Sequence, residues 1–527
     1  MFRIEYLNLK GHHQLGDLEL YLSEENELKN ISKPYTSVII GPNGTGKSFI
    51  LRTIAEIFRQ FKGYSETERS EINLSFNFHL RYTFYHNSFE IISRKQKNSS
   101  RREYLFFKNR PFTDIDFSEI TTENTDQYYF TQHSELEFPE KLLVNSVMLT
   151  DRFIWKDSSP GDFYQYLGAR STSSTSSTKS SSRRTINHIF NASSTNNDFL
   201  VNLAELLQLL GFEKSFKVQY RTKIHKLFFS GKLTEDDFRT YFENWWDEGF
   251  IYTTRKKDNP IWSIPYYNNH FKYNEIETNK LIAFLNAISL TDSGLEHIKN
   301  SSSKHLTIDL FGNIADETFL TYVRHLENLD IINLKGIKLN KLNSSLSVTD
   351  LSSGEYHLLI SLIGMFANIS KDSLILIDEP EISLHPNWQM RYISFLKNVF
   401  SKFADCHFIL TTHSHFLVSD LEGKSSSVTA LSRDAKSNAL KAELLNLNTY
   451  GWSAEEVLLK VFKVATSRNY YIAEKLGILL DFIASEDSTS QMIKDKFYEL
   501  KLDNLVGLTD EDPLKTVYDT IIKEYVS

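Results

Sequence analysis

Cysteine is almost absent from this sequence, whose 527 residues include one, Cys406. A disulfide-stapled fold is therefore excluded, and we expect a reducing compartment, the cytoplasm. Positive charge is not in excess either, because 59 Lys and Arg residues face 67 Asp and Glu residues, a formal charge of −8. Any contact with nucleic acid must then come from a local patch. The most apolar run, residues 358–367, is about half as long as a membrane-spanning helix, so we expect no membrane segment.

Composition and periodicity divide the chain into successive regions of an α/β protein. The first, residues 1–165, alternates strand patterns with one strong helix. Residues 166–198 are rich in Ser and Thr and offer little to bury, which predicts a flexible loop. Mixed helix and strand patterns fill residues 199–345. A strand–helix–strand pattern follows over residues 346–420, and residues 421–527 are expected to be mainly helical.

The strongest motif is GPNGTGKS at residues 41–48, which follows an apolar strand pattern and precedes a helical one. That context is what a phosphate-binding loop requires. Its glycines let successive backbone N–H groups point at a phosphate, Lys47 reaches the β- and γ-phosphates, and the Ser48 hydroxyl ligates Mg²⁺. The predicted ATP-binding residues are Gly41, Pro42, Asn43, Gly44, Thr45, Gly46, Lys47 and Ser48.

Two carboxylates end an apolar strand pattern at residues 374–379, in the second half of the chain. Asp378 is placed to hold Mg²⁺, directly or through water. Glu379 is a candidate base that orients or deprotonates the attacking water. An apolar strand that ends in two carboxylates is common by itself, so the assignment of these roles depends on the motifs around it.

Three further motifs accompany these carboxylates: LSSGE at residues 351–355, SLH at residues 383–385, and an apolar strand that ends just before His413. Together with residues 41–48, their order resembles the ABC-type ATPase superfamily: Walker A, signature, Walker B, D-loop and switch histidine. The resemblance implies an ABC-type P-loop ATPase head, to which the residue patterns add a mixed α+β insertion lobe and a helical C-terminal region. It also implies a homodimer or higher oligomer, in which two heads close over two ATP molecules.

In such a dimer, the resemblance implies that each signature loop meets the γ-phosphate bound by the opposite head. Ser352 would then supply a hydroxyl, and Gly354 a backbone N–H at a helix N-terminus. His413 would contact the γ-phosphate and sense hydrolysis, and with Glu379 it forms the predicted catalytic pair.

The signature motif differs from that of transporter ATPases at two positions, which points to the non-transporter branch of the superfamily. Ser353 stands where transporter ATPases usually have Gly, and Glu355 where they have Gln, which is more similar to non-transporter ATPases. Residues 378–389 and 411–417 resemble the ATPase half of OLD-family nucleases and the PtuA-type ATPases of Septu and retron defence systems. Residues 448–458 look more like the PtuA type.

The PtuA-type resemblance implies an ATP-hydrolysing regulatory subunit of an antiphage defence complex, with an HNH nuclease as its partner. In retron-linked systems a reverse transcriptase and its RNA–DNA product would join the complex. Docking is expected within residues 421–527, where Tyr450, Trp452 and Phe462 offer aromatic anchors. In the same region, Ser453 and Glu456 predict a capping box that opens a helix.

Other functions stay open: a DNA-repair or recombination ABC ATPase, a degenerate OLD-like nuclease, and an oligomer that uses ATP as structural glue. Residues 199–345, with Trp245, Trp246 and Trp262, favour a globular lobe over the coiled coil that a repair clamp needs.

The sequence also offers candidates for two further features of an ATP site. The Q-loop counterpart is expected within residues 144–151, and the adenine-stacking residue stays open among His12, His13 and Tyr35. The basic cluster over residues 94–102 could touch nucleic-acid phosphate, although a hairpin tip explains it as well.

Overall fold

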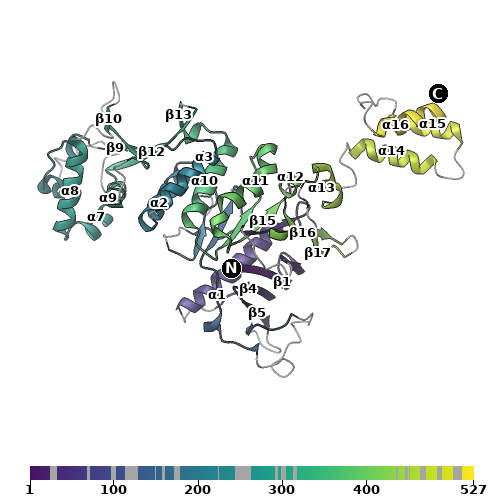
Figure 1. Cartoon of the computed structure of the whole chain (residues 1–527), viewed down its shortest axis with the longest axis horizontal. Coiled ribbons are helices and arrows are strands. Elements are labelled where there is room, and N and C mark those ends of the chain that lie inside the picture. The colour runs from purple at the N-terminus through teal and green to yellow at the C-terminus, as the bar shows by residue number, and fades with distance from the viewer. Residues whose placement is uncertain are drawn as a thin grey trace. The chain divides into compact units, whose positions relative to one another are not determined.

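The computed structural model of the chain divides into two compact units, Met1–Tyr450 and Gly451–Ser527, and each is described by itself (Figure 1). The residues that it describes are 1–23, 33–67, 72–95, 102–112, 129–148, 150–156, 161–170, 178–196, 198–223, 225–243, 263–290, 295–297, 304–312, 317–342, 344–419, 421–434, 437–445, 449, 451–462, 470–483, 489–502 and 513–526.

A seven-stranded sheet forms the centre of the first unit. Its strands, in spatial order, are β17 (Leu440–Leu445), β16 (Ser426–Arg433), β3 (Tyr35–Ile40), β15 (His407–Thr412), β14 (Leu374–Asp378), β7 (Leu142–Ser146) and β8 (Tyr164–Tyr166). All neighbours are parallel except β16 and β17. Strands β3, β7, β14 and β15 are buried at every position, which accounts for their continuous apolar runs. The residues that follow β3, β14 and β15 therefore meet at one edge of the sheet.

A second, antiparallel sheet covers helix α1 (Lys47–Thr67). Its order is β2 (Gly16–Tyr21), β1 (Phe2–His12), β4 (Asn77–Phe84), β5 (Asn87–Lys95) and β6 (Arg102–Lys108). One hydrophobic core contains Phe2 and Phe78 of this sheet, Ile54 and Phe58 of α1, and Leu376 of β14. Helix α1 is thus held between two sheets, which fixes the direction of its first turn.

A third sheet belongs to the insertion between the two halves of the ATPase motifs. Its order is β10 (Leu295–His297), β11 (Lys304–Asp309), β9 (Phe216–Thr222), β12 (Ile332–Lys341) and β13 (Ser344–Ser347). The helices of this region are α4 (His225–Phe228), α5 (Glu235–Glu243), α7 (Ile264–His270), α8 (Glu275–Leu290) and α9 (Glu317–Asn328). Helices and strands are therefore mixed here, while Trp245, Trp246 and Trp262 lie outside the described residues.

The remaining helices of the first unit surround the central sheet. They are α2 (Thr178–Thr195), α3 (Phe199–Leu209), α10 (Ser353–Asn368), α11 (Pro386–Val399) and α12 (His415–Val418), with the 3-10 turns η2 (His133–Glu135), η5 (Val348–Asp350), η6 (Ser401–Phe403) and η7 (Gly423–Ser425). Helices α2 and α10 pack side by side (Figure 1).

Helix α2 lies in a segment that was expected to be a loop. We expected a flexible loop over residues 166–198, and this is wrong for the part that forms α2. Ile186, Ile189 and Phe190 recur at helical spacing and are buried, so an amphipathic pattern was hidden by the polar composition around it. Residues 171–177 of the Ser/Thr-rich stretch lie outside the described part of the chain.

The second unit is helical in its described residues, with α13 (Ala454–Lys460), α14 (Tyr470–Ile483), α15 (Ser490–Glu499), α16 (Pro513–Ile521) and a final π-helical turn (Ile522–Val526). The predicted capping box of Ser453 and Glu456 is confirmed at the start of α13.

The expectation that residues 421–527 are mainly helical is wrong for β16 and β17, which belong to the first unit and complete the central sheet. The first four residues of β16 are all buried, as is Leu431, which is the pattern of a strand inside a parallel sheet. None of the described helices is long and apolar enough to cross a membrane.

A buried ion-pair network ties the antiparallel sheet together around Glu90, which is 1% exposed. One carboxylate oxygen accepts hydrogen bonds from Arg81 (2.9 Å) and from Arg110 Nε (3.2 Å). The other accepts from His79 (2.7 Å) and also contacts Arg110. Burial alone would raise the pKa of Glu90, but the bonds from His79 and Arg110 outweigh it and lower this pKa to about 2.

We expect Glu90→Gln to lower the free energy of unfolding by about 3 kcal/mol or more at neutral pH, because Arg81 and Arg110 would keep their buried charges without the carboxylate. The folded-state pKa of Glu90 lies below the ordinary value of 4.5, so its contribution is complete above that value. It is lost as the pH falls toward about 2. Thermal melts should therefore show a large gap between wild type and variant near neutral pH that narrows at acid pH.

Glu103→Gln is the matched control, since Glu103 lies in the same sheet and pairs with Arg94 at 2.8 Å with a side chain 38% exposed. An exposed pair of this kind contributes less than about 1 kcal/mol. Equal destabilisation by the two substitutions would contradict the assignment of Glu90 as the centre of the network.

Candidate ATP site

The phosphate-loop residues 41–48 follow β3 and lead into α1. A Cβ on Gly41 would lie 2.9 Å from the Cβ of Leu431 in β16, and a Cβ on Gly46 would lie 2.5 Å from Cδ2 of Leu15. Gly46 also has a φ of +85°, in the left-handed region that glycine adopts without strain. Close packing against β16 and against the β1–β2 turn therefore fixes the curled path of the loop.

Lys47 lies at the start of α1 and is 4% exposed. Its Nζ donates hydrogen bonds to the carbonyl oxygens of Gly41 (2.8 Å) and Pro42 (3.3 Å), and it lies 3.0 Å from Nδ1 of His413. Burial lowers the pKa of Lys47, while the nearby carboxylate of Glu379 acts in the opposite direction. The structure thus holds a largely desolvated ammonium group beside the carboxylates that follow β14.

Asp378 connects the two halves of the site. Ser48 Oγ donates to its Oδ1 at 3.0 Å, and Thr411 Oγ1 donates to the same oxygen at 2.5 Å. The other oxygen, Oδ2, is buried and has no hydrogen-bond partner among the described residues. Burial raises the pKa of Asp378 to about 6. A hydroxyl and a carboxylate with an unpaired oxygen form the hard-oxygen donor set that Mg²⁺ prefers, so the residues fit this ion.

Glu379 and His413 are in direct contact through Oε1 and Nε2. The hydrogen bond from His413 is the main cause that lowers the pKa of Glu379, and burial opposes it. Glu379 has a φ of +48°, which is uncommon for a residue with a side chain, and its N–H donates to the carbonyl of Thr411 at 3.1 Å. The chain therefore turns sharply at the end of β14, and the carboxylate reaches the switch histidine predicted from the sequence.

Glu381 is a residue that the sequence analysis missed. Its Oε1 accepts hydrogen bonds from Thr412 Oγ1 (2.8 Å) and from the backbone N–H of His413 (2.7 Å). Burial raises its pKa, and its Oε2 is buried without a partner in the described part of the chain. Glu381 thereby sets the position of His413. The only signal for it was a third carboxylate just after Asp378 and Glu379.

Arg433 was also missed, because residues after 420 were expected to be helical. Its two terminal nitrogens donate to the carbonyl oxygens of Gly44 and Asn438, each at 3.0 Å. The end of β16 thus adds a guanidinium group to the rim of the phosphate loop.

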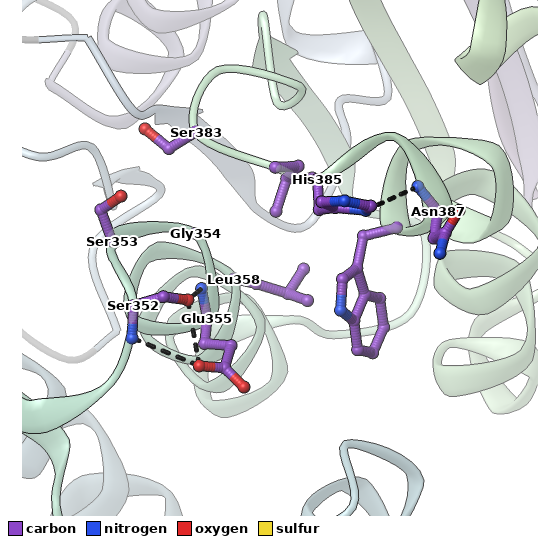
Figure 2. Close-up of a pocket in the computed structure, with 10 residues that line it drawn as sticks. Ser352, Ser353, Gly354, Glu355, Leu358, Ser383, His385 and Asn387 are labelled. Carbon is purple, nitrogen blue, oxygen red and sulfur yellow. Dashed lines mark hydrogen bonds between the residues drawn. The ribbon is translucent and has the colours of Figure 1, made fainter.

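The signature motif begins helix α10. Ser352 Oγ accepts from the N–H of Glu355 at 3.3 Å, and a Glu355 carboxylate oxygen accepts from the Ser352 N–H at 3.2 Å, which completes a capping box (Figure 2). A Cβ on Gly354 would lie 2.2 Å from the carbonyl oxygen of Ser383. Only glycine fits at this position, so the signature motif and the D-loop are in direct contact.

A cavity of about 720 Å³ opens beside this contact, and Figure 2 shows the signature residues on one side and His385 with Asn387 on the other. Its lining includes Ser352, Gly354, Glu355, Leu358, Ser383 and Trp388. None of the described residues that line it belongs to residues 41–48. Within one chain, the structure therefore brings the Walker A, Walker B and switch residues together, and it places the signature motif at a separate cavity.

The proposed Q-loop segment, residues 144–151, lies at the end of β7. Ser146 pairs opposite Asp378 in the sheet, so this segment starts next to the Walker B carboxylate. Asp151 pairs with Arg170 at 2.6 Å and is buried. Leu149 lies outside the described residues.

Two of the three candidates for adenine stacking are not accessible. His12 is 5% exposed and stacks on His13, with ring centres 4.6 Å apart. Tyr35 is 1% exposed and is covered by the guanidinium of Arg3 at 3.8 Å. Of these candidates, only His13 is exposed.

Comparisons with known proteins agree with this architecture. The AAA ATPase domain family matches residues 3–418, well over half of the chain. The chain is also similar to the Septu protein PtuA of Bacillus thuringiensis, with 29% identity over 134 residues, which are 25% of this chain and 32% of the relative. The match thus spans about a third of that relative's length.

Among solved structures, the chain is similar to an Smc head bound to the C-winged helix domain of ScpA, with 12% identity and a TM-score of 0.35 over 84% of this chain and 98% of that one. An SMC head domain from Thermotoga maritima gives 12% identity and a TM-score of 0.33 over 85% and 99%. These TM-scores are below 0.5, so the assignment below does not depend on either structure.

The order of motifs, the parallel sheet that joins Ser48 to Asp378, and the family match lead to one assignment. The ABC-type P-loop fold expected from the sequence is confirmed, and so is the resemblance to PtuA-type ATPases. This chain belongs to the AAA ATPase domain family.

Proposed function

We propose that this ATPase is the regulatory subunit of an antiphage defence complex, and that it binds and hydrolyses ATP to control a partner HNH nuclease. The observation that carries the ATPase part is the convergence of Lys47, Ser48, Asp378, Glu379 and His413 at one edge of the central sheet. The defence role and the nuclease partner rest on the similarity to PtuA. A reverse transcriptase partner rests on the motif resemblance alone.

Binding follows from the loop geometry. Backbone N–H groups of residues 41–48 and the helix N-terminus would bind the ATP phosphates, with Lys47 beside the γ-phosphate. To do so, Lys47 exchanges its bonds to the loop carbonyls for bonds to phosphate. Ser48 and Asp378 would hold Mg²⁺, which neutralises charge on the phosphates when bound. Arg433 lies close enough to the loop to add a second positive charge.

Hydrolysis needs a base next to the γ-phosphate. Glu379 stays ionised because its pKa is lowered by His413, so its carboxylate can accept a proton from, or orient, the attacking water. His413 contacts both Glu379 and Lys47, and Glu381 fixes its backbone. A change at the phosphate that moves Lys47 would therefore also move His413, which is the role expected of a switch residue.

Glu379→Gln should bind ATP and Mg²⁺ as wild type does but slow phosphate release by about 100-fold or more, because the base is removed while the binding groups remain. Lys47→Ala should instead lose nucleotide affinity. Binding of a fluorescent ATP analogue and steady-state phosphate release measure the two effects separately.

Glu422→Gln serves as the control, because this exposed carboxylate of the same unit contacts Lys33 at 3.5 Å and Ser425 Oγ at 3.4 Å and none of the described residues of the candidate site, so both readouts should match wild type. Wild-type turnover by Glu379→Gln would show that the catalytic assignment is wrong. Negligible ATP hydrolysis by the wild type itself would favour the alternative in which bound ATP only holds an oligomer together.

A composite site between two copies is the second part of the proposal. The signature cavity contains none of the phosphate-loop residues, so a signature contact with ATP requires a second head. In that arrangement Ser352 would offer its hydroxyl, and Gly354 its N–H at the start of α10, to the γ-phosphate on the opposite head.

Mixing Lys47→Ala with Ser352→Arg chains should therefore restore part of the turnover, because a mixed dimer contains one intact site. Mixing Lys47→Ala with Asp378→Asn is the matched control, since both substitutions damage the same half of the site and no intact site can form. Phosphate release is the measurement, after subunit exchange has been demonstrated with labelled chains. Equal activity of the two mixtures would argue against a composite site.

The partner nuclease is proposed to dock on the second unit. This part of the chain is a separate compact unit that the phosphate chemistry does not use. Its helix α14 exposes Ile478 and Leu480, each 44% exposed, and α15 exposes Met492 and Tyr498. Exposed apolar side chains on a small helical unit are typical of an interface.

Ile478→Asp with Leu480→Asp should abolish co-purification with an HNH partner and leave ATP binding unchanged, because the charges oppose burial in an interface. The control, Val201→Asp with Leu209→Asp on α3, changes two apolar residues of the first unit that are 59% and 56% exposed. Melting curves of both variants check that they fold.

The chain alone, with Mg²⁺ or Mn²⁺ and ATP, should leave DNA and RNA intact. Metal-dependent cleavage that survives Glu379→Gln would favour an OLD-like nuclease instead.

A further inference from the structure

A second cavity, of about 440 Å³, lies at the far end of α1 from the phosphate loop. It is lined by Arg59 and Lys62 of α1, by Lys141 just before β7, by Lys156, and by residues 161–164 leading into β8. Because β7 and β8 are parallel to the other central strands, this is the amino edge of the sheet, opposite the ATP site. Arg59 is 59 − 47 = 12 residues along the helix from Lys47, or about 18 Å.

The cavity is positively charged in a chain that is negative overall. Four cationic side chains line it, against the two carboxylates of Glu140 and Asp162. The Lys141 ammonium is held in place by the carbonyl oxygens of Gly161 (2.5 Å) and Asp162 (3.0 Å), and Lys156 lies 3.6 Å from the Asp162 carboxylate. The local excess of positive charge stands out against the net charge of −8 and favours an anionic ligand.

Arg59 gives an independent reason to expect a ligand. Its Nε is buried and has no hydrogen-bond partner among the described residues. A buried donor left without an acceptor destabilises the folded state. Guanidinium and ammonium groups together are the side chains that bind phosphate oxygens best, so a phosphate would supply the missing acceptor.

Two aromatic residues, Phe163 and Tyr164, line the cavity together with Gly63 and Gly161. Phe163 is partly buried and packs against the main core, while Tyr164 is fixed by a hydrogen bond from its hydroxyl to the carbonyl of Ile154 at 2.6 Å. Tyr164 is 4% exposed, so Phe163 is the ring that remains for a sugar or base to pack on. Cations beside one accessible ring suit a nucleotide unit, whose phosphate would meet the cations.

We propose that this cavity binds a phosphate-bearing nucleotide unit, either as a free nucleotide or as part of a single-stranded nucleic acid. The site is separate from the ATP site and does not depend on the proposed defence role. It would give the acidic chain a local contact for nucleic acid that its overall charge does not provide.

The experiment uses the full chain with Lys47→Ala, so that the ATP site does not contribute. Fluorescence anisotropy measures binding of a labelled oligo(dT) strand, and fluorescent AMP forms the second arm. Lys62→Glu with Lys156→Glu should weaken binding by about tenfold or more, because two cations of the cavity are reversed. Lys371→Glu with Lys402→Glu, an equal charge change at exposed lysines elsewhere, should alter it by about twofold or less.

Each outcome decides one point. Binding of both oligo(dT) and AMP supports a site for a nucleic-acid strand, and binding of AMP alone supports a site for a free nucleotide. In both cases the loss of binding must be confined to Lys62→Glu with Lys156→Glu. Lys156→Gln, at a side chain 58% exposed, should show a smaller loss in the same direction, and it keeps the test valid if the double variant does not fold. Equal losses in the cavity and control variants, or no binding of either probe, would overturn the proposal.

Discussion

The ATP site depends on the parallel register of three buried strands. Register pairs Asp378 of β14 with Thr411 of β15, and Thr412 with Ile40 of β3. Because of this alignment, the hydroxyl of Ser48 reaches Asp378 across 330 residues of sequence. A shift of one residue in β14 would turn the Asp378 side chain to the other face of the sheet and separate its carboxylate from the Ser48 hydroxyl, with which it is proposed to hold Mg²⁺.

The same edge concentrates charges that burial disfavours. Burial lowers the pKa of Lys47 and raises that of Asp378, so each group is pushed toward its neutral form. Glu379 is the exception, because its hydrogen bond with His413 keeps it ionised. A phosphate for Lys47 and a cation for Asp378 would each add counter-charge at these buried groups, so the arrangement is better explained by ligand binding than by fold stability.

Local motifs made the core of this site predictable. The glycines of residues 41–48, the strand that ends at Asp378, and the capping box at Ser453 each depend on neighbours in sequence. Arg433 and Glu381 were missed because their roles come from tertiary contacts, one with Gly44 and one with the backbone of His413. Helix α2 was missed because a few buried apolar side chains outweigh the polar composition of the segment.

Contacts between the signature cavity and the ATP site run through the D-loop. Gly354 lies against the carbonyl of Ser383, and the next carbonyl, that of Leu384, accepts a hydrogen bond from Gln389 at 2.8 Å. Gln389 in turn accepts one from Ser414, the neighbour of His413, at 2.6 Å. Ser383 has a φ of +74°, so this turn is held in a conformation that a residue with a side chain adopts at a cost. The hydrogen bonds of Gln389 connect this turn to Ser414, next to His413, so the contact proposed for a second head at the signature cavity would be linked to His413 of the same chain.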